Sequence, residues 1–408
     1  MRDLRQGAAG SRMLFFWASM VFFWFSLYTY PVLLSDFARQ ELGATPAMAG
    51  AIIGSFGLTQ LVLRIPLGFL SDSLRRRKPF LILGSVLTTL AAFGLWQAKT
   101  PLAAWFARST AGMGASNWVA FSVLFASYEK RTNNIYAMGT LTACMYGAQL
   151  LASQCGGFVA QAVGTRGAFL LAIAVGAIGI ITSTGVADVR PKKQSRTMRD
   201  MLAVIKNRMM LRCAGLAILM QFIVWSTLFG FSPQWAQTVL GADAAQLALL
   251  STVQLLSTII FSWAGSALLE PRFGANLVAA LGFMCIAVSC LLMPFTAVFF
   301  QMLCLQFVSG IGVGCIHPLT MAFCIRDISP EQQGLGMGVF QSLYALGMSA
   351  GPILAGALIQ WVSPVVDGVS QYVVGYRVNF GVMAAVGLLG ALLAFLWMPR
   401  VAARRSKS

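Results

Sequence analysis

Charged residues are scarce in this sequence. Of its 408 residues only 10% are charged, whereas 58% are hydrophobic and the mean hydropathy is +0.76. Soluble globular proteins carry roughly 25% charged residues, so this chain has too few to cover a water-facing surface. The composition excludes a disordered protein and a small disulfide-bonded scaffold, and it argues against a soluble enzyme. It indicates a protein that crosses a membrane many times.

Acidic residues are absent from the middle of every long apolar segment. The 12 acids lie at segment ends, in connections or in the N-terminal tail. A carrier of organic cations usually needs a buried carboxylate to balance the charge of its substrate. This absence therefore disfavours a cation as substrate.

Motifs for metals, nucleotides and covalent catalysis are also missing. The 8 cysteines lie in or beside apolar segments without metal-ligand spacing, and His317 is the single histidine. Glycine-rich stretches such as 310–314 are not followed by a Lys-Ser/Thr pair, and no nucleophile and base lie at one membrane depth. We therefore expect no cofactor, no metal, no nucleic-acid partner and no enzymatic activity.

Twelve segments are long and apolar enough to span a bilayer, which takes about 20 residues. They are approximately 13–36, 46–70, 79–98, 101–127, 134–160, 167–187, 211–238, 244–269, 275–296, 298–324, 334–359 and 376–398. The long polar connection 188–210 has apolar residues at helical spacing and predicts a short amphipathic helix on the inner membrane face. We expect an all-α integral membrane protein with a six-helix bundle in 1–187, this linker in 188–210 and a second six-helix bundle in 211–408.

Basic residues outnumber acidic ones by 29 to 12, for a formal net charge of +17. Most of them fall in the two tails and in alternate connections, all on one predicted side of the membrane. This is the positive-inside pattern. It predicts a multi-pass protein of the plasma (inner) membrane with both termini in the cytoplasm.

The two halves of the chain resemble each other at an offset near 198 residues. The tripeptide Leu-Gly-Ala that begins at Leu42 recurs at Leu240, and the Arg-x-x-x-Gly-x-Gly pattern at Arg108 recurs as Gln-x-x-x-Gly-x-Gly at Gln306. An even number of spans in each half gives both copies the same orientation. Such a parallel repeat predicts a substrate path along the axis between the halves.

Segment 68–78, Gly-Phe-Leu-Ser-Asp-Ser-Leu-Arg-Arg-Arg-Lys, is similar to the loop 2–3 signature of the major facilitator superfamily. The Arg-x-x-x-Gly-x-Gly pattern in the fourth predicted span resembles a second signature of that family. The resemblance covers nearly the whole chain and implies a bacterial-type twelve-span secondary transporter. The fifth-span signature of exporters is reduced to Gly156 and Gly157, while its Gly-Pro stands in the eleventh span as Gly351 and Pro352; this departure puts export in doubt.

The resemblance implies roles for two groups of residues. One is a conformational latch at the inner ends of spans two and three, where an acid can pair with basic residues or cap a helix; for the basic residues, membrane topology is an equal explanation. Its members are Gly68, Asp72, Arg75, Arg76, Arg77 and the neighbouring Glu129. The second group is expected to pack or bend helices: Gly112, Gly114, Gly156, Gly157, Gly351 and Pro352.

Charged and titratable residues within the apolar segments are candidates for coupling. The resemblance gives Arg108 a part in proton or substrate coupling, and a pair with Asp36 that protonation breaks is one hypothesis; the other makes Asp36 a solvated mouth residue. Arg64 is interpreted as structural. Histidine titrates in the range that a proton-driven carrier uses, although for His317, which has no visible partner, a neutral ring bonded to a carbonyl freed by Pro318 is the favoured interpretation.

The remaining polar and aromatic residues of the spans suit a neutral, amphipathic or anionic solute. The candidates are Asn117, Gln149, Gln221, Trp225, Gln341 and Tyr344, together with Tyr28, Tyr146 and Gln254. The leading hypothesis is a secondary active transporter that moves a small organic solute by alternating access, driven by a proton gradient. Metabolite uptake, export and passive facilitation remain open within transport, and a non-transporting membrane sensor or scaffold is the alternative.

Overall fold

The computed structural model describes residues 2–74, 76–128, 134–188, 204–329, 332–366 and 369–400. The first half contains α1 (Arg2–Tyr28), α2 (Pro31–Asp36), η1 (Phe37–Glu41), α3 (Pro46–Ser73), α4 (Lys78–Gln97), α5 (Pro101–Ala115), α6 (Trp118–Tyr128), α7 (Asn134–Val163) and α8 (Thr165–Thr184). The second half contains α10 (Arg208–Ser226), η2 (Thr227–Phe231), α11 (Ser232–Leu240), α12 (Ala244–Ala264), η3 (Gly265–Leu269), α13 (Glu270–Phe273), α14 (Ala275–Leu292), η4 (Met293–Phe295), α15 (Phe299–Cys324), α16 (Gln333–Val362) and α17 (Tyr372–Trp397). A two-stranded antiparallel hairpin, β1 (Val365–Val366) and β2 (Val369–Ser370), joins α16 to α17.

Within the described residues, 10 helical stretches are long and apolar enough to cross a membrane. They coincide with ten of the predicted spans. The predicted fourth span is split into α5 and α6 by a break at Ser116 and Asn117, and the fifth is the 30-residue α7. The chain is therefore an all-α, multi-pass membrane protein, to which the structure adds the short β-hairpin.

Helix ends follow local signals in the sequence. The Thr100 side chain accepts a hydrogen bond from the Ala103 N–H, which caps α5. Asp243 and Gln246 form a capping box at the start of α12, with N···O distances of 2.8 and 2.9 Å. Side-chain acceptors at these positions satisfy backbone N–H groups that have no partner within the helix.

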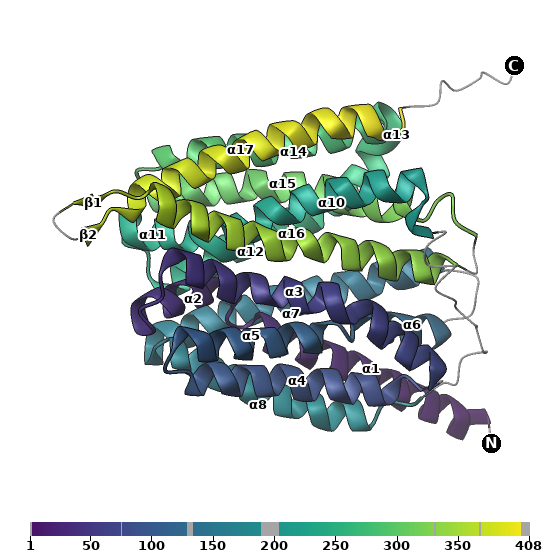
Figure 1. The fold of residues 1–408 in the computed structure, drawn as a ribbon. Coiled ribbons are helices and arrows are strands. Elements are labelled where there is room, and N and C mark those ends of the chain that lie inside the picture. The colour runs from purple at the N-terminus through teal and green to yellow at the C-terminus, as the bar shows by residue number, and fades with distance from the viewer. Residues whose placement is uncertain are drawn as a thin grey trace, which may run out of the picture.

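The helices of each half pack mainly on one another (Figure 1). In the first half α4 packs on α5 and α8, and α1 packs on α8; in the second, α12 packs on α15, α14 on α17 and α10 on α16. The most extensive contacts between the halves are those of α3 with α16 and of α7 with α12, and α2 also packs on α11 and α12. Helix α1 begins and α17 ends at the same end of the molecule, here called the terminal end, while α2, α11 and the β-hairpin lie at the opposite, hairpin end.

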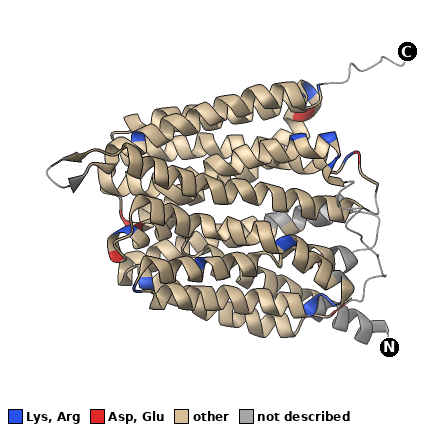
Figure 2. Cartoon of the chain, viewed as in Figure 1, with Lys and Arg blue, Asp and Glu red and all other residues tan. Residues whose placement is uncertain are grey.

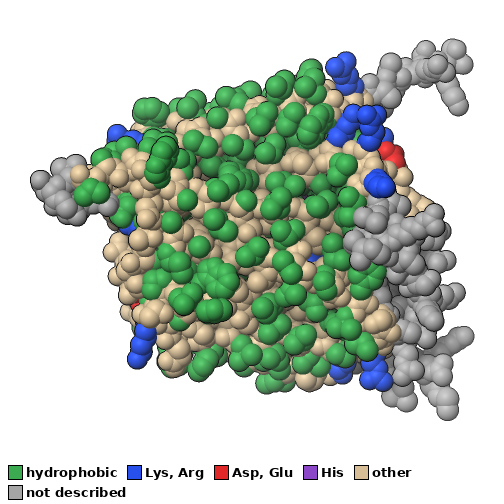
Figure 3. All heavy atoms as spheres, viewed as in Figure 1, with side chains coloured by type: hydrophobic (Ala, Val, Ile, Leu, Met, Phe, Trp, Pro, Cys, Tyr) green, Lys and Arg blue, Asp and Glu red, His purple; other side chains and the backbone are tan. Residues whose placement is uncertain are grey.

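The lateral surface is apolar. Hydrophobic side chains cover the face shown in Figure 3 between the two ends, and Lys, Arg, Asp and Glu gather mostly at those ends (Figure 2). Trp361, near the hairpin end, is 84% exposed. A large exposed apolar surface between two charged rims is what a bilayer requires of a protein that crosses it.

The internal repeat is present in the backbone. Gly43 and Gly241 have positive φ angles of 64° and 66°, a conformation that glycine adopts without steric cost. The residues that follow them make the same bond: the Ala44 N–H donates to the Ala38 carbonyl (2.8 Å) and the Ala242 N–H to the Ala236 carbonyl (3.1 Å). These positions are all separated by the predicted offset.

The residues expected to pack helices lie where two helices approach closely. They are Gly112, Gly114, Gly156, Gly157, Gly351 and Pro352. At Gly156 a methyl group would overlap the carbonyl oxygen of Thr29 on the end of α1. At Gly50, on α3, it would overlap the carbonyl oxygen of Pro352 on α16. Small residues allow the backbones of membrane helices to approach this closely, and the second contact joins the two halves.

Candidate functional site

A cavity of about 150 Å³ lies between the two halves. The first half lines it through α1, α3, α6 and α7, and the second half through α10, η2, α12, α15 and α16. Its polar and aromatic lining consists of Trp24, Tyr28, Phe56, Gln60, Arg64, Trp118, Tyr146, Gln149, Gln221, Trp225, Phe229, Gln254, Thr258, His317, Gln341 and Tyr344. This position on the axis between the halves is where the internal repeat places a substrate path.

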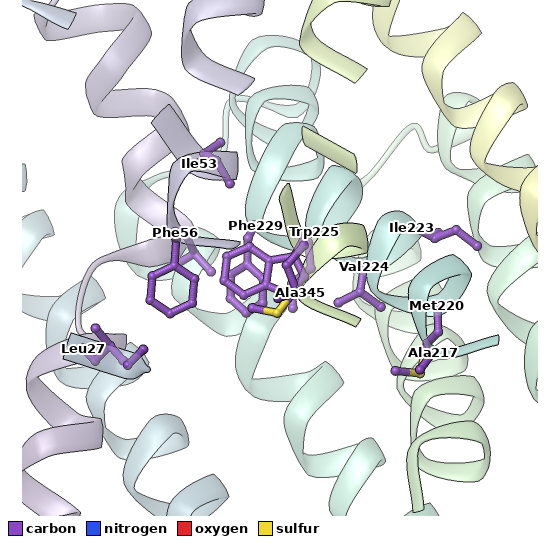
Figure 4. Packing of buried hydrophobic residues seen from close by; sticks show 14 of the residues in the cluster. Leu27, Ile53, Phe56, Ala217, Met220, Ile223, Val224, Trp225, Phe229 and Ala345 are labelled. Atoms are coloured by element: carbon purple, nitrogen blue, oxygen red, sulfur yellow. The ribbon is translucent and has the colours of Figure 1, made fainter. Parts of the chain in front are cut away.

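Aromatic rings from both halves meet in the wall of the cavity (Figure 4). Phe56 of α3 stacks on Trp225 of α10, with ring centroids 5.2 Å apart and planes at 19°. Phe229 lies next to Trp225 at 4.8 Å and contacts Tyr28 of α1 at 6.1 Å. These rings form an apolar, flat surface across the boundary between the halves.

Arg64 projects from α3 into the same cavity. Its Nη1 donates to the Gln341 carbonyl of α16 (3.0 Å), and its Nη2 donates to Oε1 of Gln60 (2.5 Å). Its guanidinium carbon lies 5.8 Å from the centre of the Tyr344 ring. Nε of Arg64 is buried and has no hydrogen-bond acceptor. The side chain is therefore a buried cation that joins the halves through neutral partners and uses two of its five N–H donors.

His317 of α15 faces Tyr146 of α7 across the cavity. The Nδ1 atom and the tyrosine hydroxyl are 3.5 Å apart, and the imidazole contacts the Tyr344 ring edge-on at 6.2 Å. The ring thus points at a hydroxyl of the opposite half. His317 thus lines the cavity, and the partner that the structure gives its ring nitrogen is a side-chain hydroxyl.

The charge of the lining is unbalanced. Among the lining residues that the structure describes, Arg64 is the single Lys or Arg, and none is Asp or Glu. A buried charge is costly unless it is paired. The arrangement suits a solute that brings negative charge or none.

The structure brings together most of the residues expected to contact solute. Gln149, Gln221, Trp225, His317, Gln341 and Tyr344 all line the cavity, as do Tyr28, Tyr146 and Gln254. Asn117 is the exception: it lies buried at the break between α5 and α6, where its side-chain amide donates to the carbonyls of Met113 and Gly114. Asn117 therefore satisfies backbone groups of the interrupted helix.

Arg108 is buried on α5, behind Phe56. Its guanidinium carbon lies 4.2 Å from the centre of the Phe56 ring and 5.6 Å from that of Tyr30. Its Nε and Nη1 have no acceptor, and no described carboxylate is within ion-pair distance. The structure does not bring Arg108 and Asp36 together.

The structure describes only some of the latch residues, and those that it describes lie at the terminal end. Gly68 has open space around it and the Arg76 side chain is exposed. Arg77 is buried and its guanidinium donates to the Ser71 hydroxyl. The Asp72 side chain and the residues Arg75 and Glu129 lie outside the described part of the chain, as does most of the predicted amphipathic helix, and the latch remains a prediction.

Asp188 makes a contact at this end that the sequence did not predict. Its Oδ1 accepts hydrogen bonds from the backbone N–H groups of Arg77 (3.0 Å) and Lys78 (3.4 Å). A carboxylate at the N-terminus of α4 satisfies unpaired N–H groups and interacts favourably with the helix dipole. This contact fixes the start of α4 to the segment that follows α8.

The halves touch directly on the hairpin-end side of the cavity. The Ala47 N–H donates to Oε1 of Gln360 (3.3 Å), and Ser153 on α7 and Ser251 on α12 have hydroxyls 2.5 Å apart. Gln161 also donates to Asp243 (3.1 Å). Together with the close approach of Gly50 to Pro352, these contacts close the hairpin end.

Sequence reasoning missed several cavity residues, and Arg64 and Gln60 are two of them. Phe56, Gln60 and Arg64 follow one another at intervals of four residues on α3, so they share one helix face. That face carries Phe56, which stacks on the opposite half. This four-residue spacing was the signal available in the sequence. It indicates that Arg64, which we had interpreted as structural, faces the cavity.

Comparison with known proteins places the chain among transporters. The family model of the Major Facilitator Superfamily matches residues 16–269 and 214–408. The uncharacterized MFS-type transporter YhcA of Bacillus subtilis is 25% identical over 191 residues, which is 47% of this chain and 33% of that protein. A probable 4-methylmuconolactone transporter of Cupriavidus pinatubonensis is 27% identical over 122 residues, 30% of this chain and 28% of that protein. These matches span about a third of the length of either relative.

A longer match and two solved structures agree with this placement. The inner membrane transport protein YajR of Escherichia coli is 22% identical over 382 residues, 90% of this chain and 77% of that protein. A mutant of the nucleoside transporter NupG has a TM-score of 0.76 at 14% identity, covering 94% of this chain and 99% of that chain. A bacterial homolog of the human lysosomal transporter Spinster, inward-facing and unoccupied, has a TM-score of 0.75 at 14% identity over 96% and 97% of the two chains. At this identity the two structures show a common fold, and the predicted fold class is confirmed.

Proposed function

The chain belongs to the Major Facilitator Superfamily, and we propose that it is a secondary transporter that moves a small organic solute by alternating access. The observation that carries this proposal is the cavity between the halves, which both halves line and which direct contacts close at the hairpin end. A solute path along the axis of a parallel repeat opens to one side at a time when the halves rock against each other.

The solute that the cavity fits is neutral, amphipathic or anionic. Arg64 supplies positive charge, the glutamine side chains supply neutral donors and acceptors, and the rings around Trp225 supply apolar area. No Asp or Glu is among the described lining residues, which disfavours a cation, because its charge would be buried without a partner.

A proton gradient is the proposed driving force, with His317 as the coupling group. Histidine is the side chain whose ordinary pKa places its charge change between pH 5 and 8. His317 also faces Tyr146 of the opposite half, so a change in its protonation acts at the boundary that moves. Arg108 is proposed to contribute indirectly, through its position behind Phe56.

The terminal end is proposed to face the cytoplasm of a bacterial inner membrane. The basic connections that the positive-inside rule counts lie at this end, among them Arg76, Lys78, Arg272 and Arg400. In this orientation the contacts at the hairpin end close the cavity to the outside. The bundles are proposed to comprise 1–187 and 211–408, with 188–210 as a cytoplasmic linker.

Solute counterflow into proteoliposomes tests the proposal. Vesicles that contain the full chain are loaded with one unlabelled solute, and entry of its labelled form is measured for a panel of neutral, anionic and cationic compounds. We expect exchange of at least one neutral or anionic compound and of no cation, and vesicles without protein are the control. Exchange of cations alone would overturn the solute class, and absence of all exchange would favour a sensor or scaffold.

Accumulation against a gradient tests the driving force separately. With the same vesicles, an imposed pH gradient is expected to drive net accumulation of the exchanged solute. Equal exchange with and without the gradient, and no accumulation, would identify passive facilitation.

A further inference from the structure

The cavity holds a cation without an anion. Arg64 is only 3% exposed, and no described carboxylate lies within ion-pair distance of it. Its partners are the Gln341 carbonyl and the Gln60 amide oxygen. A neutral oxygen compensates a buried guanidinium less well than a carboxylate does, so an anionic solute would complete the site.

Three of the five N–H donors of Arg64 remain for such a solute. Nε has no acceptor, and Nη1 and Nη2 each use one of their two N–H groups. An unmade hydrogen bond of a buried charged group is costly. A carboxylate in the cavity can accept from the unused N–H groups without breaking the two bonds that hold the guanidinium in place.

A second buried cation reinforces the positive potential on this wall. The Arg108 guanidinium carbon lies 4.2 Å from the Phe56 ring centre on the side of α5, and Phe56 itself lines the cavity. Two of the Arg108 nitrogens are also without acceptors. The first-half wall therefore attracts an anion from two positions, and no described acid in the lining opposes it.

The remaining shape and chemistry favour a small ring. The cavity measures about 150 Å³, and an apolar cavity of roughly this volume engineered in another protein binds benzene. Phe56, Trp225 and Phe229 offer flat faces on which a planar ring can stack.

Resting on the transport function proposed above, we infer that the solute is a monocarboxylate with a single planar ring, and that Arg64 binds its carboxylate. Arg64 then determines the selectivity for anions over neutral analogues of the same shape. The aromatic rings around Trp225 determine the selectivity for a flat body.

Benzoate, benzamide and benzylamine form a matched set of probes, because they differ in charge and hardly in shape. Their binding to the purified full chain in detergent is measured by calorimetry, and their counterflow is measured in proteoliposomes. Benzoate is expected to bind most tightly, benzamide about 10- to 100-fold more weakly as charge-assisted hydrogen bonds predict, and benzylamine not at all. 2-Naphthoate, which has two rings, is expected to exchange more slowly than benzoate.

Three variants assign the effect to Arg64. Arg64→Gln is expected to weaken benzoate binding about 10- to 100-fold while leaving benzamide binding nearly unchanged. Arg64→Lys keeps the charge and loses the planar fork, so an intermediate loss for benzoate is expected. Arg212→Gln removes an exposed arginine at the terminal end of α10 and serves as the matched control, without effect on either ligand.

The outcomes separate this inference from the transport function. Benzamide binding as tightly as benzoate to the wild-type chain, or an equal loss of both ligands in Arg64→Gln, would overturn the inference. Should Arg64→Gln fail to fold, the inference is still tested by the preference of the wild-type chain for benzoate over benzamide and by the loss of benzoate binding in Arg64→Lys. Exchange of other solutes without any benzoate binding would refute the claim that the solute is a ring monocarboxylate and would leave the transport function standing. Absence of exchange for every compound would refute transport.

Discussion

The imidazole Nδ1 of His317 lies 3.5 Å from the hydroxyl of Tyr146, across the cavity between α15 and α7. The two residues belong to different halves and are separated by 171 positions in the sequence. An ionisable side chain is therefore placed at the boundary along which the halves must move. This relationship suggests how a proton can be linked to the change of access.

His317→Gln is expected to abolish accumulation driven by a pH gradient and to leave counterflow within about threefold of wild type, because glutamine keeps a polar side chain but does not titrate. Parallel assays of accumulation and counterflow in proteoliposomes check this. Tyr146→Phe is the matched control. It removes the hydroxyl that faces His317 but leaves the His317 imidazole in place, so accumulation should persist. Undiminished accumulation in His317→Gln would exclude the residue as the coupling group.

Joining Ser153 and Ser251 covalently is expected to stop transport. Their hydroxyls are 2.5 Å apart across the boundary between α7 and α12, and rocking of the halves must separate them. In the double variant Ser153→Cys/Ser251→Cys, oxidation should lower the counterflow rate about tenfold or more, and reduction should restore it. The two single variants under the same oxidant control for the native cysteines. Full activity of the cross-linked protein would show that this contact does not open.

Gly156→Ala is expected to destabilise the protein, because the added methyl group would overlap the Thr29 carbonyl. Overpacking of this kind costs about 1–3 kcal/mol, which should lower the midpoint of thermal unfolding in detergent. Gly147→Ala, on the same helix, adds a methyl group into open space and should leave the midpoint unchanged or raise it slightly. Equal midpoints for both variants would mean that α1 and α7 do not pack as described.

Lys99 and Arg272 are exposed residues expected on opposite sides of the membrane. In intact cells an impermeant maleimide should label Lys99→Cys and leave Arg272→Cys unlabelled until the membrane is permeabilised. The chain without either substitution measures labelling of the native cysteines. The reverse pattern would invert the proposed orientation.

Several features of the site were readable from single stretches of sequence. Gln149, Gln221, Gln341 and Tyr344 were recognised because polar side chains inside apolar spans have few stable positions except a shared interior or cavity. The internal repeat could be recognised because the same turn, with a left-handed backbone that favours glycine, occurs at Gly43 and at Gly241. Local spacing was enough in these cases.

Other features depended on which helices meet. Arg64 was expected to play a structural role near the inner face, yet it lines the cavity because α3 packs on α16, which brings the Gln341 carbonyl within 3.0 Å. Asn117 was expected in the cavity and lies instead at a break between helices. A sequence gives the depth of a residue along its helix but not the direction from which a distant helix approaches.

The sequence by itself determined the spans, the repeat and the charge asymmetry, because hydropathy, glycine conformation and the placement of basic residues act within short stretches of chain. Only the tertiary structure decided the partners of the buried charges: Arg64 bonds neutral oxygens across the boundary, and Arg108 packs on Phe56 rather than on Asp36. Those partners come from helices far apart in the chain, and the packing of the two halves selects them.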